Sequence, residues 1–401
     1  MKNLRQFLPD NWGLVLSAFA AAYGVGLLAL LALPFLISAI MSDLGLDAAQ
    51  AGFLMSAEFI FTMLASLVVA PAMGRAPRRT LALGGALVVI GANLASASIS
   101  DVYWLTAVRC IAGIGAGLCL ACGNASVSSA KDPDRAAGHM NILFVGLMAI
   151  VMIVFADAMG RNGLTGLYYA IAATNALMLL LIVFMPQKAI LHANAPHFQH
   201  GNKHQNLFSL AAVCMMATMF FFSMRDTMGW AFVEQVGVSV GYSGEELGSL
   251  FSLQSLIGLL GPLAAAMIGK RFGMSTPVII GILSTGAVSL GYVLGESSKE
   301  MYTISVMMIS TTYFYALAYL TALAAQLDSE GRIAAASGAF LTLGIAVGPA
   351  FTGLLAESGG FTLVGWGIAG AVLLTVLTAL VPLAVIRQQH ATAAPATRAA
   401  I

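Results

Sequence analysis

Long apolar runs are the feature that most constrains how this chain can fold. A helix needs roughly 20 apolar residues to cross the hydrocarbon core of a bilayer, and runs of this length fill most of the sequence. They occupy residues 12–41, 49–74, 79–100, 102–129, 135–157, 164–186, 207–236, 243–272, 276–296, 300–327, 331–357 and 361–387. The runs lack the period-two alternation of barrel strands, and a helix satisfies its own backbone hydrogen bonds in lipid. The sequence therefore predicts an all-α membrane protein with twelve transmembrane helices.

The composition agrees with this class of fold and excludes others. Hydrophobic residues make up 59% of the chain and charged residues 9%, whereas a soluble domain has about 25% charged residues. The net charge of +1 and the lack of a basic stripe argue against a nucleic-acid partner. The sequence has no phosphate-binding loop, HExxH motif or nucleophile elbow. We therefore expect no enzyme activity, cofactor or metal site.

The longest polar interruption divides the chain into two halves. It covers residues 187–206 and separates six apolar runs in 1–186 from six in 207–387. Similar stretches, "DPDRAAG" at 132–138 and "DSEGRIAAASG" at 328–338, each open the fifth run of their half. Such a repeat is typical of transporters built from two parallel halves around a central site. We expect two six-helix bundles, a cytoplasmic linker at 187–206 and a flexible cytoplasmic tail at 388–401.

Lys and Arg residues predict the orientation, because cytoplasmic loops carry an excess of them. With the N-terminus inside, the outer loops hold only Arg161 and Lys299. The inner loops and termini then hold Lys2, Arg5, Arg75, Arg78, Arg79, Lys131, Arg135, Lys188, Lys203, Lys270, Arg271, Arg332, Arg387 and Arg398. This bias predicts that both termini are cytoplasmic. The opening residues lack a small-residue cleavage site, which indicates an uncleaved anchor. The high Ala and Gly content fits a bacterial inner membrane, and we expect the protein to be a monomer.

Two motifs resemble a known family. In the fourth run, "RCIAGIGAG" places Arg109 before Gly113, Gly115 and Gly117, and this is similar to the Arg-then-glycine pattern of the major facilitator superfamily. The resemblance covers essentially the whole chain. It implies two helical bundles that rock around a central cavity lined by the first, fourth, seventh and tenth helices of the fold.

The loop after the second run matches the signature of that family only in part. Arg75, Arg78 and Arg79 stand at its basic positions, but Gly74 replaces the acid and Pro77 the second glycine. The loop-to-helix charge pairing that the family uses as a gate is therefore in doubt.

A glycine–proline motif lies in the eleventh run. The proline-glycine signature that drug antiporters of the family carry in the fifth run is missing, and "GIAVGPAFTG" with Gly344, Gly348 and Pro349 occupies the equivalent place in the second half. The missing signature argues against drug–proton antiport as the function. Glycine and proline let helices approach closely and bend, and ordinary membrane packing explains them as well.

Glu58 and Arg109 lie at matching depths in the second and fourth runs. Ionisable residues within a span cost roughly 2.5 kcal/mol or more, so they face the protein interior or a wet cavity. One interpretation is a structural ion pair that locks the two helices together. The other is that Glu58 exchanges a proton while Arg109 favours its charged form.

The stretch "FFFSMRDTMGWAFVEQ" at 220–235 places Arg225 and Asp226 inside the seventh run. Consecutive helical residues are about 100° apart, so the two side chains cannot both face the same neighbour. We expect Asp226 to take part in proton coupling or cation contact and Arg225 to bind an anionic group. Trp230 adds an aromatic group to the outer end, and Glu234 is expected to be solvated or paired in a gate.

Further polar or aromatic candidates for a solute cavity are Tyr23, Asn124, Gln254, Tyr315 and Tyr319. Tyr315 and Tyr319 share a helix face, although packing explains them equally. The Cys119–Cys122 pair lies in an apolar helix and fits packing better than metal binding. The histidines of the central loop, which fit a solvated linker, are His192, His197, His200 and His204.

These observations predict a secondary active transporter that works by alternating access. Its partners would be the bilayer, protons and a small organic solute, with an acidic or aromatic group as the candidate chemistry. A proton-driven efflux antiporter for amphipathic compounds is an alternative within transport. A membrane receptor or scaffold that moves no solute is the alternative from another class.

Overall fold

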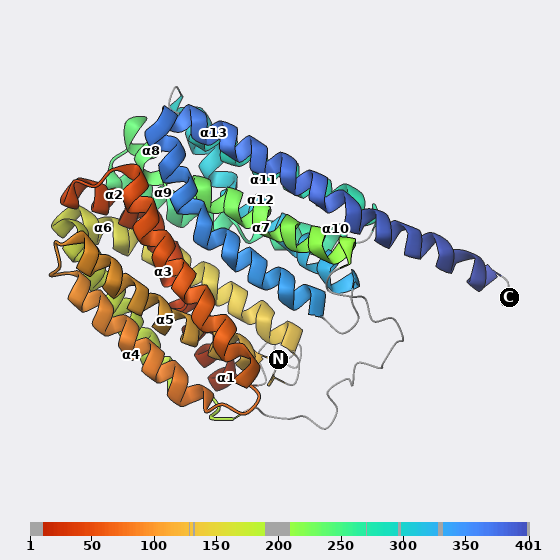
Figure 1. Cartoon of the computed structure of the whole chain (residues 1–401), viewed down its shortest axis with the longest axis horizontal. Coiled ribbons are helices and arrows are strands. Elements are labelled where there is room, and N and C mark those ends of the chain that lie inside the picture. Colours follow the sequence, from red (N-terminus) through yellow and green to blue (C-terminus); the bar gives the residue numbers. More distant parts are fainter. Residues whose placement is uncertain are drawn as a thin grey trace, which may run out of the picture.

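A computed structural model describes residues 11–127, 129–130, 133–188, 209–269, 271–295, 298–327 and 332–398. All regular secondary structure in these ranges is helical (Figure 1). The first half of the chain contains α1 (Trp12–Phe19), the π-helical turn η2 (Ala20–Val25), α2 (Leu28–Leu44), α3 (Ala48–Val69), the 3-10 turn η3 (Ala70–Ala72), α4 (Arg78–Ser96), α5 (Val102–Val127) and α6 (Pro133–Ile182). The second half contains α7 (Leu210–Trp230), α8 (Val233–Ser239), α9 (Gly244–Ile257), α10 (Leu260–Ile268), α11 (Ser275–Val293), α12 (Lys299–Leu327) and α13 (Arg332–Arg398).

Within the described ranges, 10 helices are long and apolar enough to cross a membrane. The two longest, Arg135–Ile182 and Ala336–Gln388, are each two helices joined at a kink. The kinks lie at Asn162–Gly163 and at Gly359–Gly360. They coincide with the boundaries that the sequence predicts between its fifth and sixth and its eleventh and twelfth helices.

The kink in α6 has a local cause. Gly163 has a φ of 57°, a left-handed conformation that only glycine adopts easily. The Asp43 carboxylate occupies the space that a Cβ on Gly163 would need, and it accepts a hydrogen bond of 2.6 Å from the Leu164 backbone N–H. The Asp43 carboxylate therefore ties the end of α2 to the start of the helix that follows the kink.

The two halves of the chain lie side by side and meet at one end (Figure 1). There α3 packs against α13 so closely that the Pro349 carbonyl lies where a Cβ on Gly52 would be, and the Ala48 carbonyl lies where a Cβ on Gly353 would be. The Ala350 N–H donates a hydrogen bond of 2.9 Å to Ser56 Oγ. This is backbone-to-backbone packing of the kind that small residues permit between membrane helices.

The glycine–proline motif of the second half thus serves two helix contacts. Gly344 and Gly348 face α7, where Ser223 Oγ and Thr227 Oγ1 lie in the space a Cβ would need. Pro349, one residue further along α13, faces α3 across the boundary between the halves. The motif therefore packs α13 against α7 in its own half and against α3 in the other half.

The basic loop after α3 fastens the first half at its opposite end. Arg78 is buried, and its guanidinium donates hydrogen bonds to Met73 O at 2.9 Å, Ala125 O at 2.8 Å and Ser129 Oγ at 2.9 Å. Arg79 donates one of 2.7 Å to Met185 O. Arg75 is exposed. Positive charge next to helix carboxyl ends is favourable, so Arg78 and Arg79 tie several helix ends of the first half together.

The ends of the chain differ in part from the expectation. The sequence predicts a flexible tail at 388–401, but α13 continues as a helix to Arg398. The alanines of this segment favour helix once a preceding helix has nucleated it. Most of the predicted linker at 187–206, with its four histidines, lies outside the described residues.

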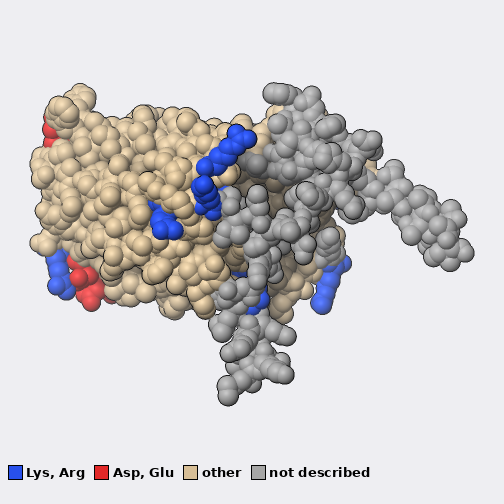
Figure 2. All heavy atoms as spheres, turned by 90° about the horizontal axis from the view of Figure 1, so that it is seen from below, with Lys and Arg blue, Asp and Glu red and all other residues tan. Residues whose placement is uncertain are grey.

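The outer surface fits a lipid environment. Figure 2 shows a face that is almost entirely uncharged, with its few charged side chains scattered. Large apolar side chains such as Val68, Trp104 and Trp366 are exposed on the described surface. A soluble protein rarely exposes apolar surface on this scale, so the helices are arranged to contact lipid.

Replacing Gly353 tests the contact between the halves. In Gly353→Val, the new side chain meets the Ala48 carbonyl, so α3 and α13 must move toward the ordinary interaxial separation of about 8–10 Å. Spin labels at Gln50 and Leu354, which are both exposed, should report a longer distance by pulsed electron paramagnetic resonance. The control is Gly84→Val, since Gly84 has open space around it. An unchanged distance in Gly353→Val would contradict the close contact.

Candidate functional site

A cavity of about 490 Å³ lies between the two halves of the protein. Its size falls in the range of roughly 300–1,000 Å³ that is usual for small-molecule sites. Both halves line it: the first through Tyr23, Leu27, Leu30, Leu31, Asn141, Phe144, Val145 and Met148, and the second through Asp226, Thr227, Trp230, Gly258, Leu259, Pro262, Ile309, Ser310, Tyr313, Phe314, Leu317, Ala318, Thr321, Leu341 and Ile345.

The cavity is covered at the end where the halves meet. Trp230 Nε1 donates a hydrogen bond of 2.9 Å to Leu30 O in the other half. The Phe251 ring packs between Trp230 and Phe35, with centroid distances of 5.7 Å and 5.8 Å. At the other end, the lining residues Asn141 and Thr321 are exposed. The cavity therefore opens toward the end of the bundle that is opposite α8.

Asp226 is the single charged residue among the described residues that line this cavity. Its side chain is 20% exposed, and its Oδ1 lies 3.7 Å from Nη1 of Arg225. Among the described residues, no hydrogen bond to the Asp226 carboxylate accompanies this ion pair. The Asp226 carboxylate therefore lines the cavity, and its one charged neighbour is the Arg225 guanidinium.

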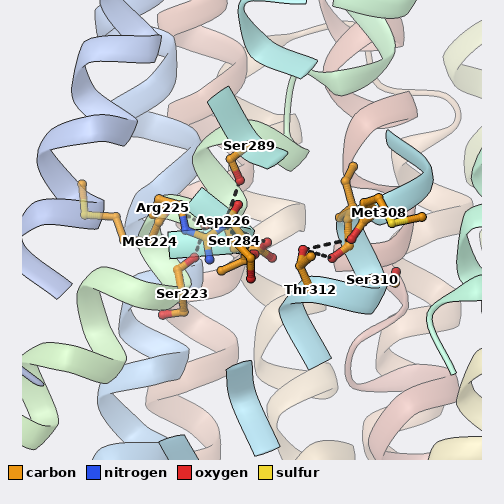
Figure 3. A network of polar contacts seen from close by, with 12 residues as sticks. Ser223, Met224, Arg225, Asp226, Ser284, Ser289, Met308, Ser310 and Thr312 are labelled. Carbon is orange, nitrogen blue, oxygen red and sulfur yellow. Dashed lines mark hydrogen bonds and ion pairs between the residues drawn. The ribbon is translucent and has the colours of Figure 1, made fainter. Parts of the chain in front are cut away.

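Arg225 points away from the cavity, toward α11. Its Nη1 donates hydrogen bonds to Ser289 Oγ at 2.8 Å, to Thr285 Oγ1 at 3.2 Å and to Thr285 O at 3.3 Å. Its guanidinium carbon lies 5.1 Å from the centre of the Phe222 ring. Figure 3 shows Arg225, Asp226 and Ser289 as one cluster, with Ser310 and Thr312 on the neighbouring α12. The sequence assigns Arg225 to an anionic solute group, but the structure buries its side chain outside the cavity lining.

A second charged cluster lies inside the first half. Arg109 Nη1 is 3.6 Å from Glu58 Oε2, and both side chains are buried. The same nitrogen donates a hydrogen bond of 3.0 Å to Asn93 Oδ1, and the guanidinium carbon lies 4.9 Å from the centre of the Tyr168 ring. Glu58 and Arg109 thus lie together as their depths in the sequence suggest, but neither lines the cavity.

Glycines on α5 make this proximity possible. The Glu58 carbonyl occupies the Cβ position of Gly113, and the Thr62 carbonyl occupies that of Gly117, so α3 and α5 touch through their backbones. Gly115 faces the Gly85 carbonyl of α4 in the same way. The glycines that follow Arg109 in the motif pack helices, and they hold Arg109 against Glu58.

The remaining sequence candidates divide into two groups. Tyr23 and Trp230 line the cavity, and Tyr23 donates a hydrogen bond of 3.3 Å to Asn141 Oδ1. Tyr315, Tyr319 and Gln254 do not line it. Tyr319 donates hydrogen bonds to Ala265 O at 3.2 Å and to Gly269 O at 3.0 Å, its ring packs against that of Tyr315, and Gln254 Oε1 accepts one of 3.3 Å from the Ser310 N–H.

Two other expectations differ from the structure. Asn124 is exposed and lies outside the cavity lining. Glu234, which the sequence places in solvent or in a gate, is not solvated, because only 2% of its surface is exposed. It lies on α8, and the Ser38 side chain of α2 in the other half lies beside its carboxyl group, so its role in a gate stays a prediction.

The sequence did not single out Tyr313, Phe314 and Asn141. On α12, the cavity is lined by Ser310, Tyr313, Phe314, Leu317 and Thr321, which follow each other at helical spacing. This stripe is offset by about one position from the tyrosine pair chosen from the sequence. Both stripes mix aromatic and hydroxyl groups, so only the packing of α12 against its neighbours distinguishes them.

The profile of the Major Facilitator Superfamily matches residues 14–342. The chain belongs to the major facilitator superfamily. It is therefore a multi-pass membrane transporter and not an enzyme. No curated protein sequence gives a significant match.

Solved structures of transporters share the fold. A crystal structure of a D-xylose–proton symporter aligns with a TM-score of 0.69 at 15% identity, covering 92% of this chain and 95% of the symporter. The nucleoside transporter NupG aligns with a TM-score of 0.67 at 15% identity, covering 92% of this chain and 98% of NupG. A variant of NupG gives 0.70 at 16% identity. At this level of identity the likeness concerns the fold alone.

A double-mutant cycle tests the buried pair in the first half. In Arg109→Met, the Glu58 carboxylate is left buried without its partner, so stability should fall by about 3–5 kcal/mol. Adding Glu58→Gln should recover part of this loss, because the orphaned charge is gone. Unfolding in detergent under increasing SDS gives the free energies. Arg161→Met, in the exposed Asp157–Arg161 pair, is the control and should cost at most about 1 kcal/mol. Strictly additive losses would show that Glu58 and Arg109 do not interact.

Proposed function

We propose that this protein is a secondary active transporter that moves a small organic solute through the cavity between its halves by alternating access. Asp226 binds and releases the coupling proton. The observation that carries this proposal is the position of Asp226: it is the one charged side chain lining the cavity among the described residues, in a site otherwise apolar and aromatic. Ionisable side chains at such depth in a membrane protein are costly and are typical of proton or ion pathways.

The arrangement of the helices supports movement of the halves. The contacts that cover one end of the cavity include close packing of α3 on α13 and of α9 on α6, the Trp230–Leu30 hydrogen bond and the Phe251 ring contacts. In the proposed cycle these contacts open while the opposite end closes.

The number of membrane crossings follows from the two kinks. The kinks divide α6 and α13 into two crossings each, which gives twelve crossings in total, and we place both termini in the cytoplasm of a bacterial cell.

Proton coupling fits the site better than coupling to a metal ion. A carboxylate alone offers one kind of ligand, whereas a hard cation requires about six oxygen ligands. Among the described residues, no cluster of His, Cys, Asp and Glu could hold a metal ion. A similar fold in a D-xylose–proton symporter also supports a proton as the coupling ion.

Glu58 is the second candidate for the proton site. It is paired with Arg109 inside the first half and does not line the cavity. A proton on Glu58 would have to act on the solute through the packing of α3 against α13. The position of Asp226 in the cavity wall requires no such relay, so Asp226 is preferred.

The test is proton movement in liposomes that contain the purified protein, read by an internal pH dye while small organic acids, aromatic compounds and organic cations are added one at a time. A solute that is transported should shift the internal pH, and Asp226→Asn should abolish that shift while solute exchange continues. Asparagine keeps the shape of the side chain and removes its titrating group. Glu58→Gln should retain the shift.

The matched control is Asp157→Asn, since Asp157 is exposed and paired with Arg161 at the surface. It should retain the full pH shift. A pH shift that persists in Asp226→Asn would show that Asp226 does not carry the coupling proton. Solute binding without transport by the folded protein would favour the receptor alternative.

A further inference from the structure

We propose that the solute of this transporter is an amphipathic organic cation, and that this cation and the proton occupy Asp226 in turn. The inference rests on the proposed function, and it names the chemical class of the solute and the exchange that follows from it. The sequence by itself suggests a solute with an acidic or aromatic group, from its mixture of arginine, carboxylate and aromatic residues, and Arg225 is the residue it assigns to an anionic group. The positions of the two side chains reverse that preference.

The cavity offers one charge, and that charge is negative. Arg225 lies behind Asp226, with Nη1 engaged by Thr285 and Ser289. Arg109 lies inside the first half, in contact with Glu58. Among the described residues, no Lys, Arg or His lines the cavity. An anionic solute would therefore find no positive partner there, whereas a cation can approach the open side of the Asp226 carboxylate.

Aromatic rings continue from one half of the protein to the other along the cavity wall. Tyr23 packs on Phe144 with a centroid distance of 4.9 Å, Phe144 on Phe314 at 6.4 Å, and Phe314 on Tyr313 at 5.4 Å. All four rings belong to the cavity lining. Aromatic faces attract organic cations, most strongly where water is excluded. The wall thus suits a cation that carries apolar or aromatic substituents.

The polar side chains of the lining argue against a sugar-like solute. Thr227 Oγ1 donates to the Ser223 carbonyl of its own helix at 3.1 Å, and Tyr23 and Asn141 bond to each other. Apart from the hydroxyl groups of Ser310, Tyr313 and Thr321, the remaining wall consists largely of aliphatic and aromatic groups. A solute with many hydroxyl groups would lose its hydrogen bonds to water without replacing them, which is costly.

Sharing one carboxylate makes the proton and the cation competitors. When a cation binds to protein with a protonated Asp226, the O–H bond of the carboxyl breaks, the proton leaves to water through the open end, and the cation pairs with the carboxylate. The other titratable or charged groups around Asp226 are Arg225 on α7, Tyr292 on α11 and Tyr313 on α12, with Tyr23 further along the lining. Among these, Asp226 is the one carboxyl group, so one proton should leave for each cation bound. The transport mode is then exchange of the cation for a proton.

The experiment is calorimetric binding of tetraphenylphosphonium and of tetraphenylborate to the purified protein in detergent. These two probes have nearly the same shape and opposite charge. Titrations in two buffers of different ionisation enthalpy give the number of protons released. In the pH range where Asp226 is protonated, we expect tetraphenylphosphonium to bind with release of about one proton. In that range its affinity should fall about tenfold for each unit by which the pH is lowered. Tetraphenylborate should bind no more tightly than it does to empty detergent micelles.

Variants separate the roles. Asp226→Asn should weaken tetraphenylphosphonium binding at least tenfold and end proton release, whereas Asp226→Glu should retain both. Tyr313→Leu should weaken binding roughly threefold to thirtyfold without changing proton release. Asp157→Asn, at the surface, should match the unmodified protein. Gel filtration and thermal unfolding of each variant identify any that does not fold, and Asp226→Glu keeps the test decisive in that case.

Three results would overturn the inference: equal binding of the two probes, tetraphenylphosphonium binding that Asp226→Asn leaves unchanged, or no binding of tetraphenylphosphonium at all. None of these affects the liposome assay, in which another solute can still drive proton movement. Conversely, cation binding with proton release but without transport in liposomes would contradict the proposed transport cycle. It would still support the cation site at Asp226.

Discussion

Backbone contact between α3 and α13 holds the two halves of this protein together at one end. It depends on glycine at positions 52 and 353, where carbonyl groups of the opposite helix fill the space of a Cβ. In lipid there is little hydrophobic drive to press helices together, so close van der Waals packing and a few hydrogen bonds carry such a contact. The contact extends over two turns of α3, from Ala48 through Gly52 to Ser56, and α9 packs on α6 across the same boundary, where the Ala156 side chain fills the space of a Cβ on Gly248. These contacts together cover one end of the cavity, and they must separate in the proposed transport cycle.

The two arginine–carboxylate pairs show how position decides the role of similar chemistry. Glu58 and Arg109 are both fully enclosed between α3, α4, α5 and α6, with the guanidinium on the Tyr168 ring. Arg225 and Asp226 are neighbours on one helix, so the turn of the helix sends them in different directions. Arg225 is held by α11, and Asp226 reaches the cavity. The first pair joins helices of one half, whereas the second exposes one member to whatever enters between the halves.

Much of the fold follows from the sequence because apolar length and glycine placement act locally. The helix ends, the kinks near 162 and 359, and the proximity of Glu58 to Arg109 could all be read from run lengths and relative depths. The rotation of each helix could not, because most faces of a membrane helix are equally apolar. Tyr313 and Tyr315 lie on the same helix in similar surroundings, and only the contacts of Tyr315 with Tyr319 and of α12 with α10 turn Tyr313 toward the cavity. Arg225 illustrates the same point, since its direction depends on Thr285 and Ser289 of another helix.

Access to the cavity from the two sides of the membrane tests the central claim most directly. Leu317 lines the cavity one turn from Tyr313 and is half-buried, so Leu317→Cys in a variant without the four native cysteines places a single thiol there. A membrane-impermeant maleimide is then applied to oriented vesicles from either side, with and without a proton gradient and tetraphenylphosphonium. Alternating access predicts labelling from both sides, with the ratio between them shifted by the gradient and by the cation. Labelling from one side alone under every condition would contradict it.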